Sequence, residues 1–168
     1  KSWWINAILC VACLGLILGF LLANNGKDRQ YRFSRAEVAA ADWLYSNASK
    51  QSLLVEGSRN YPSQFRNYEY FNYVPISEES AETQEQILAD PVNVLGRWLG
   101  EAPSGGYVIV TRSQIAGIED LGLMPKGAMA SIVAKLTASA RFDLVYSNRD
   151  AKVFRLDGAA ASFGTWVN

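Results

Sequence analysis

Residues 107–111 read YVIVT, and this run is the clearest strand in the chain. It is continuously apolar, as in a strand that other elements cover on both faces. A second short run, SLLVE at residues 52–56, ends at Gly57 and is also expected to be a buried strand. Two such strands predict a sheet in the interior of an α/β domain.

Helical patterns precede and separate these strands. Ser34 and Glu37 form a Ser-x-x-Glu capping box, which predicts a helix through about residue 47. Further helices are expected over residues 78–89, 91–99 and 113–121, and from Pro125 onward with Ala128, Ile132, Val133 and Leu136 as the core face. Residues 58–76 hold four tyrosines and the two prolines Pro62 and Pro75, and they fit neither a clean helix nor a clean strand.

The chain closes with two strand-like runs. Residues 142–146 and 152–156 flank the turn sequence SNRDA, which predicts a β-hairpin. The expected fold class is therefore α/β, with a compact mixed sheet, helices on its faces and an antiparallel hairpin at the C-terminal end.

The opening segment predicts a membrane anchor. Residues 3–23, WWINAILCVACLGLILGFLLA, are uncharged, and at about 1.5 Å per residue they span the ~30 Å hydrocarbon core of a bilayer. A cleaved signal peptide is the alternative, but the run is longer than the usual ~7–15 apolar residues and no Ala-x-Ala site follows. We expect a transmembrane helix at 1–23, a polar connector at 24–33, a soluble domain at 34–156 and a tail at 157–168.

Composition excludes several kinds of site. The chain has no histidine, and its 16 basic residues balance its 16 acidic ones. We therefore expect no nucleic-acid partner, no metal site and no cofactor. Within the anchor, Gly15 and Gly19 form a Gly-x-x-x-Gly pattern, which favours close packing with another transmembrane helix or with subunits of a larger complex.

Polar and aromatic residues follow both predicted strands. In open α/β sheets, ligands bind beyond the carboxyl ends of parallel strands. Arginine suits phosphate or carboxylate groups and tyrosine suits sugar rings, so a glycan or a polyprenyl phosphate is the expected ligand. The candidate binding residues are Arg59, Tyr61, Arg66, Tyr68, Thr111, Arg112 and Gln114. The alternative is that the tyrosine-rich segment only covers the sheet edge or packs on the membrane surface.

No catalytic motif is present in the sequence. It lacks a phosphate-binding loop of the Gly-x-x-x-x-Gly-Lys type and a Gly-x-Ser-x-Gly motif. The acidic pairs Glu78/Glu79 and Glu119/Asp120 are interpreted as surface charge. We expect no catalytic centre in this chain.

Three stretches together resemble a known family. They are similar to the C-terminal region of bacterial C-type (GT-C) polytopic membrane glycosyltransferases. The stretches are Ala41–Leu44 followed by SLLVEG, then NYPSQFRNYEYFNYVPI, and finally YVIVTRSQ together with FDLVYSNRDAKVFRL. The resemblance covers residues 3–156. It implies that a last transmembrane helix is followed by an extracytoplasmic α/β domain at the bacterial cytoplasmic membrane. The family keeps its catalytic acids in loops between early helices, which this chain lacks, so no residue is carried over as catalytic.

Two questions stay open at this point. Lys27, Arg29, Arg32 and Arg35 follow the anchor, and the positive-inside rule alone favours a cytoplasmic domain; the resemblance favours the outside. The second is function. The chain is the non-catalytic tail of a lipid-linked-sugar glycosyltransferase or a single-pass accessory subunit of a larger membrane complex, for instance an energy-transducing one. A free-standing enzyme on an anchor is the third alternative.

Overall fold

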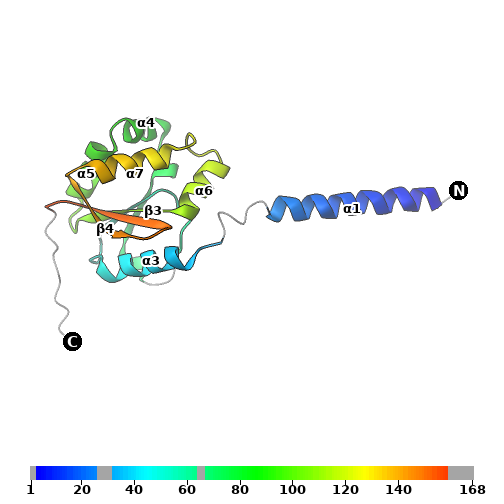
Figure 1. Ribbon diagram of the computed structural model, residues 1–168, viewed down its shortest axis with the longest axis horizontal. Coiled ribbons are helices and arrows are strands. Elements are labelled where there is room, and N and C mark those ends of the chain that lie inside the picture. Colours follow the sequence, from blue (N-terminus) through cyan, green and yellow to red (C-terminus); the bar gives the residue numbers. More distant parts are fainter. Residues whose placement is uncertain (1–2, 26–31, 64–66, 159–168) are drawn as a thin grey trace.

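The computed structural model describes residues 3–25, 32–63 and 67–158 (Figure 1). The domain contains one five-stranded sheet with the order β2-β1-β3-β5-β4. β1 pairs in parallel with β2 and β3, whereas β5 pairs antiparallel with β3 and β4. The expected mixed α/β fold with a C-terminal hairpin is confirmed. The strands are β1 (Leu53–Glu56), β2 (Asn72–Pro75), β3 (Gly106–Thr111), β4 (Phe142–Ser147) and β5 (Ala151–Leu156).

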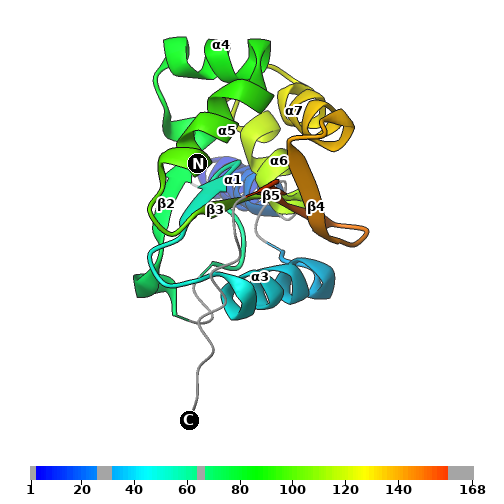
Figure 2. The same cartoon turned by 90° about the vertical axis from the view of Figure 1, so that its left-hand side faces the viewer.

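Among the described residues, helices cover both faces of the sheet. Figure 2 shows α3 on one face and α4, α5, α6 and α7 on the opposite face. The bounds are α3 (Arg35–Asn47), α4 (Ala81–Ala89), α5 (Pro91–Glu101), α6 (Arg112–Asp120) and α7 (Ala128–Ala138). Two short 3-10 helices, η1 (Tyr68–Tyr70) and η2 (Ile76–Glu78), flank β2.

The central strand β3 explains why YVIVT is apolar throughout. Val108 and Val110 pack into the core beneath α4–α7, while Ile109 packs into the core beneath α3. All three side chains are buried. Since each successive side chain of a strand points to the opposite face, a strand covered on both sides needs apolar residues at every position.

The predicted capping box is present at the start of α3. The Ser34 backbone N–H donates to Glu37 Oε2 at 2.8 Å, and the Glu37 N–H donates to Ser34 Oγ at 3.2 Å. These bonds satisfy backbone donors that the first turn of a helix leaves without partners. α3 begins where the sequence predicted it.

Other boundaries differ from the expectation by a few residues. α4 starts at Ala81 because Ser80 caps it, accepting from the Thr83 N–H. α7 starts at Ala128 because Gly127 precedes it with φ +80°, a left-handed conformation that favours glycine. Val133, expected in the core face, is only partly buried.

The tyrosine-rich segment contains an edge strand that its sequence did not predict. β2 has only four residues, and its Asn72 side chain is exposed. Its backbone conformation follows from parallel pairing with β1, and a run of four residues gives little sign of such pairing in the sequence.

The N-terminal helix α1 (Trp3–Asn25) is unlike the helices of the domain. Its residues Trp3–Ala23 are long and apolar enough to cross a membrane, and all of them are exposed. Nothing lies within 4 Å of the positions that a Cβ would take at Gly15 and Gly19. α1 is thus a candidate single-pass membrane helix.

Candidate functional site

The two stretches singled out by sequence meet at one edge of the sheet. β1 and β3 are parallel neighbours, so the residues after Glu56 and after Thr111 lie side by side. Gln114 Nε2 donates to the Ser58 carbonyl at 2.8 Å, and Ser113 Oγ donates to the Asn60 carbonyl at 2.8 Å. The segment that leaves β1 is therefore bound to the first turn of α6.

Three of the predicted ligand-binding residues are used by the fold itself. Thr111 and Gln114 form a capping box for α6, with the Thr111 N–H donating to Gln114 Oε1 at 2.8 Å. Both side chains are buried. Tyr61 is also buried, and its hydroxyl lies 3.2 Å from that of Tyr45. These side chains position the edge of the sheet.

Two further predicted residues lie on the surface. Arg59 Nε donates to Glu78 at 2.8 Å, and about half of each of these two side chains is exposed. Tyr68 stacks on Tyr73 of β2 with ring centroids 4.4 Å apart. This stacking agrees with the alternative that the tyrosines cover the sheet edge. Arg66 lies outside the described residues.

Arg112 and Glu37 join α6 to the start of α3. Arg112 Nη2 donates to the Arg32 carbonyl at 2.8 Å and to Glu37 Oε2 at 3.1 Å, and the Ser113 N–H donates to Glu37 Oε1 at 2.7 Å. Burial raises the pKa of Glu37, but hydrogen bonds from Ser113 and Ser34 and the charge of Arg112 outweigh it. The net pKa lies below the ordinary value. Glu37 is a buried, ionised and well-partnered carboxylate.

Glu56 is a buried acid that sequence reasoning did not single out. Its side chain is 1% exposed, and Oε2 has no hydrogen-bond partner among the described residues. Burial raises its pKa to about 7, although a hydrogen bond with Tyr61 and the charge of Arg59 act in the opposite direction. The available signal was an acidic residue at the end of the apolar run SLLVE.

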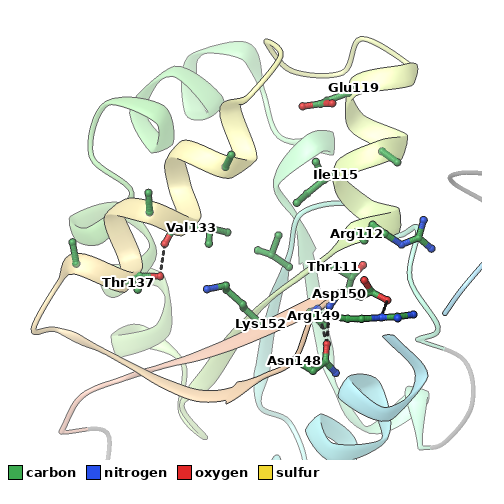
Figure 3. A pocket seen from close by; sticks show the side chains of 16 residues that line it. Thr111, Arg112, Ile115, Glu119, Val133, Thr137, Asn148, Arg149, Asp150 and Lys152 are labelled. Atoms are coloured by element: carbon green, nitrogen blue, oxygen red, sulfur yellow. Dashed lines mark hydrogen bonds and ion pairs between the residues drawn. The ribbon is translucent and has the colours of Figure 1, made fainter. Parts of the chain in front are cut away.

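A cavity of about 740 Å³ opens between α6, α7 and the β-hairpin (Figure 3). Thr111 and Arg112 line it, so two of the seven predicted binding residues border a cavity. The sequence did not predict this cavity. Val110 and Lys152, which are paired across β3 and β5, also line it. The volume falls within the range of about 300–1,000 Å³ found for small-molecule pockets. Sequence patterns could not show it because α6 and α7 meet only in the folded domain.

The charged groups of the cavity are unevenly partnered. Arg149 Nε lies 3.2 Å from Asp150 Oδ2, which also accepts from Ser34 Oγ at 2.6 Å. The Lys152 ammonium group has no hydrogen-bond or ion-pair partner among residues 3–25, 32–63 and 67–158. Figure 3 shows its side chain extending away from Arg149 and Asp150 toward α7.

The acidic pairs occupy structural or surface positions. Glu78 pairs with Arg59, and Glu119 Oε1 accepts from the Gly127 N–H at 3.2 Å. Across the described part of the chain, no group of three or more His, Cys, Asp or Glu side chains could hold a metal ion.

Comparisons with known proteins give no further guide to the family. Searches with protein-family models, against curated proteins and against solved structures found no match to this chain. The functional argument therefore depends on the residues and geometry given above.

Proposed function

We propose that this chain is a membrane-anchored, extracytoplasmic and non-catalytic domain that binds a glycan or a lipid phosphate at the bacterial cytoplasmic membrane. In this proposal it corresponds to the C-terminal region of the glycosyltransferases that its sequence resembles. The observation that carries the proposal is the bond between the segment after α1 and the carboxyl end of β3.

That bond limits how far the site can lie from the membrane. The Arg32 carbonyl accepts from Arg112, and Arg32 is only seven residues beyond Asn25, the last residue of α1. An extended chain covers at most about 3.6 Å per residue, so Arg32 lies within about 25 Å of the end of α1. With α1 in a bilayer, Arg112 and the cavity that it borders stay close to the lipid surface.

Accessible polar groups at this edge suit such a ligand. The side chain of Arg112 is 42% exposed and that of Arg59 is 54% exposed, although both take part in ion pairs. Guanidinium groups bind phosphate through paired N–H donors, and a ligand phosphate would compete with the carboxylate partners. Tyr68, whose side chain is also exposed, offers a flat face to a sugar ring.

A binding experiment tests the ligand. The full chain in phosphatidylcholine nanodiscs is titrated with polyprenyl phosphate and, separately, with soluble glycans. Arg59→Ala and Arg112→Ala should weaken saturable binding, while Arg97→Ala, an exposed arginine on α5, should not. No saturable binding would contradict the proposal. Recovery of a stoichiometric membrane complex in that case would favour the accessory-subunit function instead.

A topology experiment tests the compartment. Glu85 is exposed on α4, so Glu85→Cys in a Cys10→Ser, Cys13→Ser background provides a single accessible thiol. A membrane-impermeant maleimide should label this thiol in intact cells. Labelling that appears only after lysis would place the domain in the cytoplasm.

A further inference from the structure

We propose that the cavity between α6 and α7 binds one apolar chain of an anionic membrane amphiphile, with Lys152 as the partner of its head group. The inference deepens the proposed function, and it rests on that function for the nearness of the bilayer. It concerns a different surface from Arg59 and Tyr68, and it adds a residue that the sequence did not indicate.

The body of the cavity is apolar because small and aliphatic side chains face it from both helices. Ile115 and Ala116 line it from α6, and Ala130, Val133 and Ala134 line it from α7. α7 turns its large side chains, Met129, Ile132 and Leu136, into the core instead. The face of α7 that lies toward α6 therefore carries only short side chains, and the space between the two helices stays unfilled.

Hydrogen-bonding groups are scarce in this part of the cavity. The Thr137 hydroxyl already donates to the Val133 carbonyl at 2.7 Å. A sugar or a peptide backbone placed here would leave polar groups without partners, which costs free energy. An alkyl chain has no such groups, and each methylene that it buries strengthens binding about fourfold.

Lys152 supplies the charge complementarity. The cavity lining holds three cations, Arg112, Arg149 and Lys152, and two acids, Glu119 and Asp150. The guanidinium groups of Arg112 and Arg149 have carboxylate partners, and the ammonium group of Lys152 has no hydrogen-bond or ion-pair partner in the described part of the chain. An ammonium group beside an apolar hollow matches an amphiphile whose anionic head lies at one end of its chain.

The polar end of the cavity lies beside the segment that follows the anchor. Arg112 borders the cavity and also binds the Arg32 carbonyl, so this end is attached to the segment that leaves the anchor. A lipid chain leaving the outer surface of the bilayer has only a short path to the opening.

Photolabelling of the full chain tests the inference. The protein in phosphatidylcholine nanodiscs is exposed to decyl phosphate that carries a diazirine in its chain, and labelled peptides are mapped by mass spectrometry. Labels should fall in α6 and α7. Unlabelled decyl phosphate should compete, whereas inorganic phosphate alone and decanol should compete at least tenfold more weakly.

Matched variants separate the cavity from the bilayer. Lys152→Met keeps the aliphatic length but removes the charge, and it should lower labelling of α6 and α7 about 10- to 100-fold. Lys126→Met, at an exposed lysine outside the cavity, should leave labelling unchanged. Ala134→Trp should fill the cavity and block labelling, and Ala39→Trp, on the exposed side of α3, is its control. If Ala134→Trp does not fold, the labelling of Lys152→Met alone tests the inference.

The possible failures are distinguishable. Labels confined to α1, or equal labelling of the wild type and Lys152→Met, overturn the cavity inference while the topology and titration results still stand. The proposed function is overturned if the chain is not attached to the membrane, or if the thiol at residue 85 proves to be cytoplasmic. Either result counts even when added decyl phosphate labels the cavity.

Discussion

Two buried glutamates lie near the same edge of the sheet, and their surroundings differ. Glu37 is 0% exposed and receives hydrogen bonds from the backbone of Ser34 and Ser113 and from Arg112. Glu56 is 1% exposed, yet one of its carboxyl oxygens has no partner among the described residues. Burial alone therefore does not determine what a carboxylate does. The partners decide whether it stabilises the fold as an anion or resists ionisation.

This contrast assigns different roles to the two positions. Glu37 connects α3, α6 and the segment that follows the anchor, so its charge is part of the structure. Glu56 is the end of a hydroxyl network in which Tyr73 donates to Tyr45, and Tyr45 and Tyr61 share a hydrogen bond. The first region should respond to loss of a side chain, and the second to pH.

The largest expected effect is at Glu37. Glu37→Ala leaves the Ser113 and Ser34 N–H groups and Arg112 without their carboxylate, and should lower the free energy of unfolding by about 4 kcal/mol. Urea unfolding of the full chain in nanodiscs, followed by circular dichroism, measures it. Glu85→Ala, an exposed control on α4, should change stability by less than about 0.5 kcal/mol. An equally small loss for Glu37→Ala would remove the contrast between the two glutamates.

The next effect is the pH dependence caused by Glu56. Its pKa is raised from 4.5 to about 7 in the folded domain. Below pH 4.5 the group is protonated in both states. As pH rises from 4.5 to 7, only the unfolded chain releases the proton, so the free energy of unfolding falls by about 3 kcal/mol.

Glu56→Gln provides the matching variant because glutamine stays neutral. The decrease in stability between pH 4.5 and 7 should disappear, and at pH 8 the variant should be more stable than the wild type by about 3 kcal/mol. Urea unfolding over a pH series gives both values. A wild type whose stability rises across this window with the same slope as Glu56→Gln would show that Glu56 is ionised in the fold.

A smaller effect is expected at Tyr61. Its hydrogen bond lowers the pKa of Glu56, so Tyr61→Phe should move the stability transition to higher pH and cost about 1 kcal/mol at pH 8. Tyr73→Phe removes a hydroxyl that reaches Tyr61 only through Tyr45. This variant should leave the pH of the stability transition unchanged. Equal shifts from both variants would mean that the network acts as a whole and not through Tyr61.

The smallest effect is at the exposed ion pair. Arg59 and Glu78 are each about half exposed, and solvent screens their attraction. Glu78→Gln should therefore change the free energy of unfolding by less than about 0.5 kcal/mol. Repeating the measurement in high salt should give the same value for wild type and variant within error. A loss above about 1 kcal/mol would show that this pair belongs with the buried contacts of Glu37.

Residue patterns predicted most elements of this fold. The run YVIVT, the Ser34–Glu37 capping box and the C-terminal hairpin appear in the structure near their expected positions. Each depends on local chemistry: apolar continuity, a cap, or two strands joined by a short turn. β2 was missed because its strand conformation depends on pairing with β1.

The candidate site was predicted only in part. The carboxyl ends of β1 and β3 do meet, and Thr111 and Arg112 do border a cavity. Thr111, Gln114 and Tyr61, however, have buried side chains that bond within the protein. A polar residue after a strand looks the same in sequence whether it faces a ligand or a helix cap, because its partners come from distant parts of the chain.

The sequence by itself determined the apolar N-terminal helix, the α/β class and the covered central strand, because these follow from the spacing of apolar and capping residues along one segment. Only the tertiary structure decided the states of Glu37 and Glu56 and the cavity beside Lys152. A pKa depends on burial and partners, and a cavity depends on what neighbouring elements leave unfilled, so both require residues far apart in the chain to be brought together.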